Sequence, residues 1–186
     1  LSAWHKNNWV AFSSMNRKLF SCFLFFSVIY SSEFNDVNID DISSTRILSI
    51  AQDSTGFIWI GTDDGLNRHD GFQNKIYRSD VFDEATISGN RIWKIHVDSS
   101  NTVWILTDRG VCFYDALRDQ FERIDTGSRP QHIQDKNNTL YVSTLNSGIY
   151  AINKETKSFK NYLFDPWDPF SVSSSKFSHQ QTKPTA

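Results

Sequence analysis

The same pattern of short apolar segments and tight turns occurs three times along this sequence. The first copy spans residues 56–71, the second begins about 45 residues later at 102–115, and a weaker third copy spans 139–153. Self-similarity at a fixed spacing of about 20–50 residues is typical of solenoids and propellers, and it constrains the fold more than any local motif. The matching positions are Trp59, Thr62 and Gly65 in the first copy, Trp104, Thr107 and Gly110 in the second, and Tyr141, Thr144 and Gly148 in the third.

Each copy is predicted to contain four short strands. In the first copy these strands are residues 47–52, 57–61, 66–69 and 73–77. The turn at 53–56 has Asp at its first position and Gly at its fourth, a composition that favours a type I turn. Four antiparallel strands in about forty residues make one propeller blade. We therefore expect an all-β fold, a partial β-propeller of about three four-stranded antiparallel blades with the start of a fourth.

The repeats divide the chain into three predicted blades at residues 46–80, 91–125 and 129–163. The link at 79–90 follows a strand that ends in Tyr77, and a similar link at 163–174 follows Tyr162. Residues 164–186 are therefore expected to be a link and the truncated start of a fourth blade. Three blades do not close a ring, because propellers have about 4–8 blades. We expect the open blade edges to self-associate, or to pair with the remainder of a longer protein.

The N-terminal segment reads as a targeting sequence. Residues 1–14 precede Met15, the only methionine, and are interpreted as upstream read-through. A positive stretch at 16–18 and an apolar stretch at 19–30 predict a signal peptide at 15–32, followed by a polar lead at 33–45. The apolar stretch is shorter than the roughly 20 residues that span a bilayer. We expect export to the periplasm; an uncleaved N-terminal anchor is the alternative.

Composition excludes several kinds of partner and chemistry. The net charge of the 186 residues is -2, which gives no electrostatic support for a nucleic-acid partner. Cys22 lies in the predicted signal peptide, and Cys112 alone makes neither a disulfide framework nor a zinc cluster, so Cys112 is expected to be a small buried side chain. The five histidines lack the spacing of metal ligands, so we expect no metal and no cofactor.

Residues 47–71 resemble the two-component regulator propeller repeat. The resemblance is carried by Gln52-Asp53, Gly56, Ile58-Trp59-Ile60-Gly61-Thr62, Gly65-Leu66-Asn67-Arg68 and Asp70-Gly71, and it extends over about residues 42–175. It implies the N-terminal piece of the periplasmic sensor region of a Bacteroidetes-type hybrid two-component system. The parent protein would be an inner-membrane histidine kinase that responds to oligosaccharides, and this piece would have no catalysis of its own.

Candidate ligand-binding residues gather at one predicted end of the propeller. Arginines precede the inner strands and aspartates occupy the second turns, and in a propeller these two kinds of loop share one end of the ring. Trp93, on an inner strand, and Trp167, in the second link, are the candidate surfaces for stacking a sugar, whereas the repeated Trp59, Trp104 and Tyr141 are expected to pack in the core. The predicted binding residues are Arg46, Asp63, Asp64, Arg91, Trp93, Asp108 and Arg129.

Two other functions remain open from the sequence. One is a fragment of a secreted propeller enzyme acting on polysaccharide, which needs paired carboxylates or a Tyr or His base at the ring centre. Asp53, Asp98 and Asp135 recur before turns, which makes them turn-forming residues and not a catalytic acid pair. The other is a non-functional gene remnant.

Overall fold

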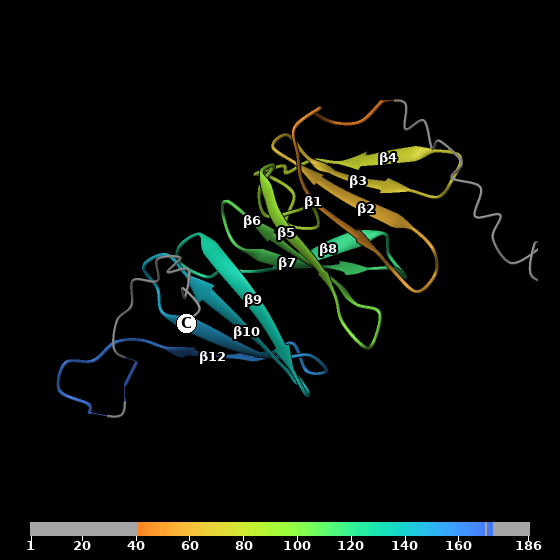
Figure 1. Cartoon of the computed structure of the whole chain (residues 1–186). Helices are drawn as coiled ribbons and strands as arrows, with labels where there is room; N and C mark the ends of the chain where they lie inside the picture. Colours follow the sequence, from red (N-terminus) through yellow and green to blue (C-terminus); the bar gives the residue numbers. More distant parts are fainter. Residues whose placement is uncertain (1–40, 170, 173–186) are drawn as a thin grey trace, which may run out of the picture. The chain divides into compact units, whose positions relative to one another are not determined.

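The computed structural model describes residues 41–169 and 171–172. The predicted read-through at 1–14, the signal peptide at 15–32, the lead up to residue 40 and the predicted fourth-blade start beyond 172 lie outside the described residues. The described part contains twelve strands in three four-stranded antiparallel sheets, each with its strands in sequence order (Figure 1). The expected all-β partial propeller is confirmed.

The strands of each sheet alternate with short turns. Blade 1 consists of β1 (Ile47–Gln52), β2 (Ile58–Thr62), β3 (Leu66–His69) and β4 (Asn74–Tyr77). Blade 2 consists of β5 (Ile92–Val97), β6 (Val103–Thr107), β7 (Val111–Asp115) and β8 (Gln120–Ile124). Blade 3 consists of β9 (Pro130–Lys136), β10 (Thr139–Thr144), β11 (Ile149–Asn153) and β12 (Phe159–Tyr162).

A buried threonine at the end of the second strand fixes the next turn in every blade. The Thr62 hydroxyl donates to the Gly65 carbonyl at 3.0 Å and accepts from the Asp64 amide at 3.1 Å. Thr107 and Thr144 make the equivalent bonds in blades 2 and 3. The glycine has a positive φ in each case, +142° at Gly65, which favours glycine because it has no Cβ. The repeated Thr and Gly of the sequence are therefore turn-forming residues.

Apolar side chains between neighbouring blades form the core. One cluster places Trp59 and Leu66 of blade 1 against Ile92, Ile105 and Phe121 of blade 2. The other places Trp104 and Phe113 of blade 2 against Leu140, Val142 and Ile152 of blade 3. Trp59 and Trp104 thus each pack against the blade that follows. Cys112 is buried within the first cluster, as expected, and burial raises the pKa of its thiol to about 11.

The expectation that Tyr141 packs in the core is wrong. Tyr141 is 39% exposed, whereas Trp59 and Trp104 at the same repeat position are fully buried. Side chains alternate between the two faces of a strand, so Leu140 and Val142 face blade 2 and Tyr141 faces the other way. No described blade covers that second face of blade 3, and Tyr141 is left in contact with solvent.

The innermost strand of each blade contains a β-bulge at the same repeat position. The register of β1 against β2 shifts at Leu48, that of β5 against β6 at Trp93, and that of β9 against β10 at Gln131. Each bulge lies two residues after a predicted binding arginine. A β-bulge changes the direction in which a side chain points. The side chains of Leu48, Trp93 and Gln131 therefore point differently from those of a regular strand.

The two long links have the same local structure. In the first, the Asp80 amide donates to the Thr86 hydroxyl at 2.9 Å and the Asp80 carboxylate accepts from the Phe82 amide. In the second, the Asp165 amide donates to the Ser171 hydroxyl at 3.1 Å and the Asp165 carboxylate accepts from the Trp167 amide. The Ser171 hydroxyl also donates to the Asp165 carbonyl, as that of Thr86 does to the Asp80 carbonyl.

A side chain from blade 2 fixes the first of these links. The guanidinium of Arg123 donates to four link carbonyls, those of Asp80, Asp83, Thr86 and Ile87. Ile87 is fully buried. Blade 2 therefore fixes the link that precedes it, just as it covers Trp59 of blade 1. Across the described residues, no helix has the length and apolar character needed to cross a membrane.

Candidate functional site

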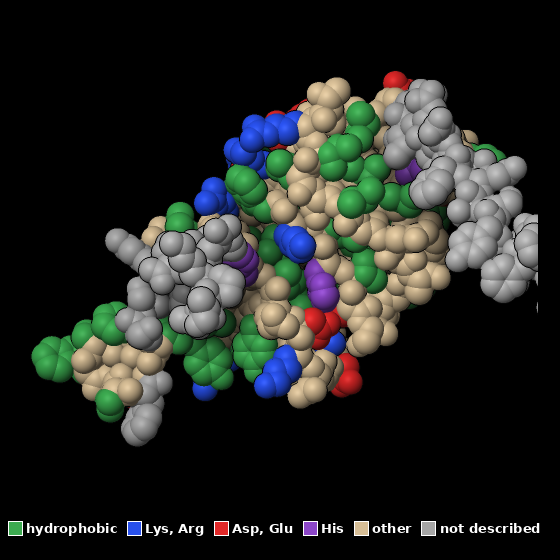
Figure 2. Space-filling model, viewed as in Figure 1, with side chains coloured by type: hydrophobic (Ala, Val, Ile, Leu, Met, Phe, Trp, Pro, Cys, Tyr) green, Lys and Arg blue, Asp and Glu red, His purple; other side chains and the backbone are tan. Residues whose placement is uncertain are grey.

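The predicted binding arginines and the second turns lie together at one end of the blades. The amide of Asp108 donates to the Arg91 carbonyl at 3.1 Å, and the amide of Leu145 donates to the Arg129 carbonyl at 2.9 Å. We call this end, with Arg46, Arg91, Arg129 and the turns at 63–65, 108–110 and 145–148, the arginine end. Figure 2 shows Lys and Arg side chains gathered along the edge where β1, β5 and β9 begin.

Three of the seven predicted site residues meet across the junction of blades 2 and 3. The guanidinium carbon of Arg91 lies 4.2 Å from the centre of the Trp93 ring, and that of Arg129 lies 4.8 Å from it. Arg91 and Trp93 come from blade 2 and Arg129 from blade 3. The Gln131 amide lies 2.9 Å from both Nη2 and Nε of Arg129 and accepts from both when its oxygen faces them. The Arg129 guanidinium is therefore held in place from its own blade.

The environment of Trp93 differs from that of a free sugar-stacking surface. Guanidinium groups, and not solvent alone, lie against its ring. Its Nε1 and the Nε of Arg91 are buried, and neither has a hydrogen-bond partner among the described residues. A buried donor without a partner destabilises the folded state, so an acceptor atom bound at this junction would be stabilising.

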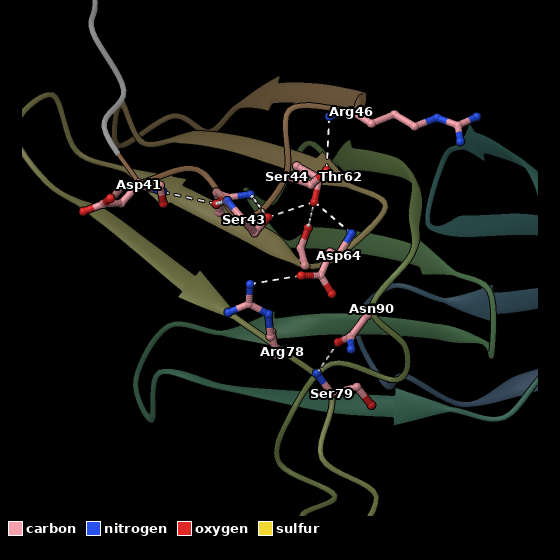
Figure 3. Close-up of polar contacts among 12 residues, drawn as sticks. Asp41, Ser43, Ser44, Arg46, Thr62, Asp64, Arg78, Ser79 and Asn90 are labelled. Carbon is pink, nitrogen blue, oxygen red and sulfur yellow. Dashed lines mark hydrogen bonds and ion pairs between the residues drawn. The ribbon is translucent and has the colours of Figure 1, made fainter.

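The predicted residues of blade 1 form ion pairs within that blade instead. The Arg46 guanidinium lies 4.0 Å from the Asp63 carboxylate, and Asp64 accepts from Arg78 at 3.1 Å. Figure 3 shows Asp64 directed at Arg78, while the Arg46 side chain extends away from both. The Ser43 and Thr62 hydroxyls share a 2.8 Å hydrogen bond beside them. These ion pairs are exposed, and exposed pairs contribute little to stability.

The junction of Arg91, Trp93 and Arg129 does not include the side chains of two other candidates, Asp108 and Trp167. Asp108 is exposed in the β6–β7 turn, close to Gly89: a Cβ added at Gly89 would lie 2.2 Å from its carboxylate. Trp167 is 90% exposed on the second link, far along the chain from the arginine end. Its amide hydrogen bond to Asp165 belongs to the local structure of that link.

Sequence reasoning missed a polar cluster between blades 1 and 2. Asp119, in the β7–β8 turn, accepts from Tyr77 at 2.7 Å and from Tyr114 at 2.6 Å, and it pairs with Arg68 and Lys75. Burial alone would raise the pKa of Asp119, but these bonds from Lys75, Tyr114 and Tyr77 lower it to about 2. The cluster joins positions 42–51 residues apart, and no local spacing in the sequence indicates such contacts.

A second missed cluster joins blades 2 and 3. Asp135 accepts from the buried Lys154 at 2.8 Å and lies 3.2 Å from the His96 ring. Burial raises the pKa of Asp135, yet the bonds to Lys154 and His96 leave it below its usual value. Asp135 was predicted as a turn residue, but it lies within β9 and serves an interblade contact. The described residues contain no group of three or more His, Cys, Asp or Glu side chains placed to hold a metal ion.

Comparisons with known proteins agree with this architecture. The sequence profile of the two-component regulator propeller matches residues 41–64. Over 50 residues the chain is 46% identical to "Histidine kinase P4" of Formosa agariphila, which covers 27% of this chain and 4% of that protein.

Two solved structures from B. thetaiotaomicron, both extracellular domains of hybrid two-component systems, share the fold. The first has a TM-score of 0.61 and 24% identity, over 73% of this chain and 20% of that one. The second has a TM-score of 0.55 and 26% identity, over 70% of this chain and 20% of that one. The chain thus spans a fifth or less of the length of these relatives.

Proposed function

This chain carries the two-component regulator propeller repeat, and on that premise we propose that it forms part of the periplasmic sensor propeller of a hybrid two-component system. In this proposal the blades bind a ligand and transmit its presence, and they catalyse no reaction themselves. The parent protein would be an inner-membrane histidine kinase. The support is the repeat match at residues 41–64 and the shared fold with extracellular domains of such systems.

The ligand we propose is an oligosaccharide bound at the arginine end. The observation that carries this is the convergence of Arg91, Trp93 and Arg129 from two blades. Loops that follow rigid strands are the usual place for binding residues, because the scaffold fixes them. Saccharides offer many hydroxyl and ring oxygens, and those oxygens are acceptors for the arginine and indole donors found here.

The proposal is tested in the host cell with the gene that encodes this chain. Transcripts are compared between the parent strain and a deletion strain during growth on a mixed polysaccharide hydrolysate. We expect the deletion to abolish induction of a set of carbohydrate-use genes, and re-introduction of the intact gene to restore it. Unchanged transcripts in the deletion strain would overturn the sensor proposal.

A second measurement separates sensing from catalysis. The purified protein is incubated with the polysaccharides of the same mixture, and new reducing ends are measured over a day. We expect no increase over a boiled control. A steady release of reducing ends would favour the propeller enzyme that the sequence left open.

A further inference from the structure

We propose that the junction of Arg91, Trp93 and Arg129 binds the anionic group of an acidic saccharide, either the carboxylate of a uronic acid or a sulfate ester. This inference rests on the proposed function and specifies the chemical class of its ligand. The two sources share one chemistry, a planar or tetrahedral oxyanion on a sugar.

The junction carries positive charge that no carboxylate of the described residues compensates. Two guanidinium groups approach one indole ring, at 4.2 and 4.8 Å, and no carboxylate of the described residues lies within ion-pair distance of either. Four other described arginines pair with aspartates, Arg46, Arg68, Arg78 and Arg118, whereas Arg109 and Arg123 have no such pair among the described residues. The indole face offsets part of the repulsion through cation–π attraction. The remaining positive charge favours an anion between the two blades.

The three side chains of the junction supply hydrogen-bond donors only. Arginine and tryptophan side chains carry N–H donors and no acceptors, so the ligand must supply acceptor oxygens. The Nε of Arg91 and the Nε1 of Trp93 are buried and have no hydrogen-bond partner among the described residues. An oxyanion would supply the acceptor that these two donors lack. A guanidinium binds carboxylate or sulfate through two parallel hydrogen bonds, a geometry that a single hydroxyl does not match.

Trp93 occupies the β-bulge of β5, where the chain re-aims a side chain, and the same bulge carries Leu48 in blade 1 and Gln131 in blade 3. Gln131 orients the Arg129 guanidinium and offers no aromatic face itself. Among the described blades, the combination of bulged tryptophan and two unneutralised arginines therefore occurs at this junction alone.

The test measures binding of matched saccharides to the full-length protein that contains this chain, reconstituted in lipid nanodiscs. Neutral, uronate and sulfated oligosaccharides of galactan, glucan and xylan backbones are compared by calorimetry at 50 and 500 mM salt. We expect at least one anionic oligosaccharide to bind about tenfold or more tightly than its neutral counterpart, and the added salt to weaken it. The uronate and sulfated arms identify which oxyanion is recognised.

The variants are Arg91→Gln, Arg129→Gln and Trp93→Phe, with Arg118→Gln as the matched control on an exposed turn. Each arginine variant is expected to lose about tenfold in affinity for the anionic ligand, since one charge-assisted contact is worth about 1.4 kcal/mol or more. Thermal midpoints of all variants are measured to verify folding. Arg91→Lys keeps the charge but cannot form the two parallel hydrogen bonds of a guanidinium. It should therefore bind the anionic ligand more tightly than Arg91→Gln and less tightly than the parent protein.

The outcomes separate this inference from the proposed function. Equal affinity for neutral and anionic saccharides, or folded Arg91 and Arg129 variants with unchanged affinity, overturns the inference and leaves the sensor proposal standing. Absence of binding in every anionic arm also overturns it. Loss of the transcript response is the separate readout of the proposed function, and it does not depend on which saccharide binds.

Discussion

The indole nitrogen of Trp59 donates a 2.8 Å hydrogen bond to the carboxylate of Asp53, six residues before it. Trp104 and Asp98 repeat this bond at 2.9 Å in blade 2. In both blades the same carboxylate also accepts from backbone amides of the intervening turn. One aspartate thereby fixes the first turn of a blade and orients the tryptophan that packs against the next blade.

The first prediction concerns Asp98→Ala. This substitution leaves the Trp104 indole and two turn amides without their acceptor in a buried site, so we expect a loss of about 3 kcal/mol in the free energy of unfolding. Urea denaturation followed by tryptophan fluorescence measures it. The matched control is Asp115→Ala, which removes an outer turn acceptor for Leu117 and should cost distinctly less. Equal losses in the two variants would contradict this role of Asp98.

The second prediction concerns the pH dependence of the contact between blades 1 and 2. The pKa of Asp119 is about 2 in the folded state, below the usual value of 3.8, because its bonds to Lys75, Tyr114 and Tyr77 outweigh the effect of burial. A lowered folded pKa means that the stabilisation is complete above pH 4 and is lost as the pH falls toward 2. Urea midpoints at pH 5, 3 and 2 should fall in this order.

The control for that prediction is Asp119→Asn. Its amide keeps the size of the side chain and has no proton to gain over this range, so the slope of stability against pH between 4 and 2 should become shallower. The carboxylate is 37% exposed, and solvent screening keeps the effect modest. A slope identical to that of the parent chain would assign the acid sensitivity to other carboxylates.

The third prediction concerns the close approach of blades 1 and 2 at Gly61. A Cβ at this position would lie 2.5 Å from Cγ2 of Ile92, which is fully buried. Gly61→Ala should therefore destabilise the chain by about 1–3 kcal/mol through overpacking. The double variant with Ile92→Ala should be less destabilised than the sum of the two single variants, because the smaller side chain makes room for the methyl group. Strict additivity in denaturation experiments would argue against this contact.

The sequence was sufficient for the features that lie within one repeat. Strand positions follow from periodicity and turn chemistry, which are local, and the burial of Trp59 and Trp104 was expected from their shared repeat position. Tyr141 shows where this reasoning stops. Its repeat position is the same, but its burial depends on a neighbouring blade, and repeat position alone does not say whether that neighbour is present.

The candidate site was predictable only in part for a similar reason. The sequence pointed to Arg91, Trp93 and Arg129 because they lie at one end of the inner strands, and the structure brings them together across a blade junction. It did not indicate that Arg46 instead pairs with Asp63, or that Asp119 joins two blades. Those contacts depend on which side chains come close in the folded chain, and neither the spacing of residues nor the composition indicates that.

The last prediction concerns the face of blade 3 that carries Tyr141. Register places Tyr141 opposite Ala151 and Ile149 opposite Tyr162, so these four side chains share one face of the sheet. Tyr141 and Tyr162 are 39% and 42% exposed there. The corresponding faces of blades 1 and 2 are each covered by the blade that follows.

We expect this face to associate with a second copy of the chain when residues 1–186 are produced alone, because apolar area removed from water is worth about 25 cal/mol per Å². Contact between this face and a different surface of the next copy would be heterologous and would give open-ended assembly. Sedimentation velocity over a hundredfold concentration range measures it. Tyr141→Asp should shift the distribution toward monomer, whereas Phe72→Asp, at a 94% exposed turn residue of blade 1, should not. A parent chain that stays monomeric at every concentration would show that the face needs no partner.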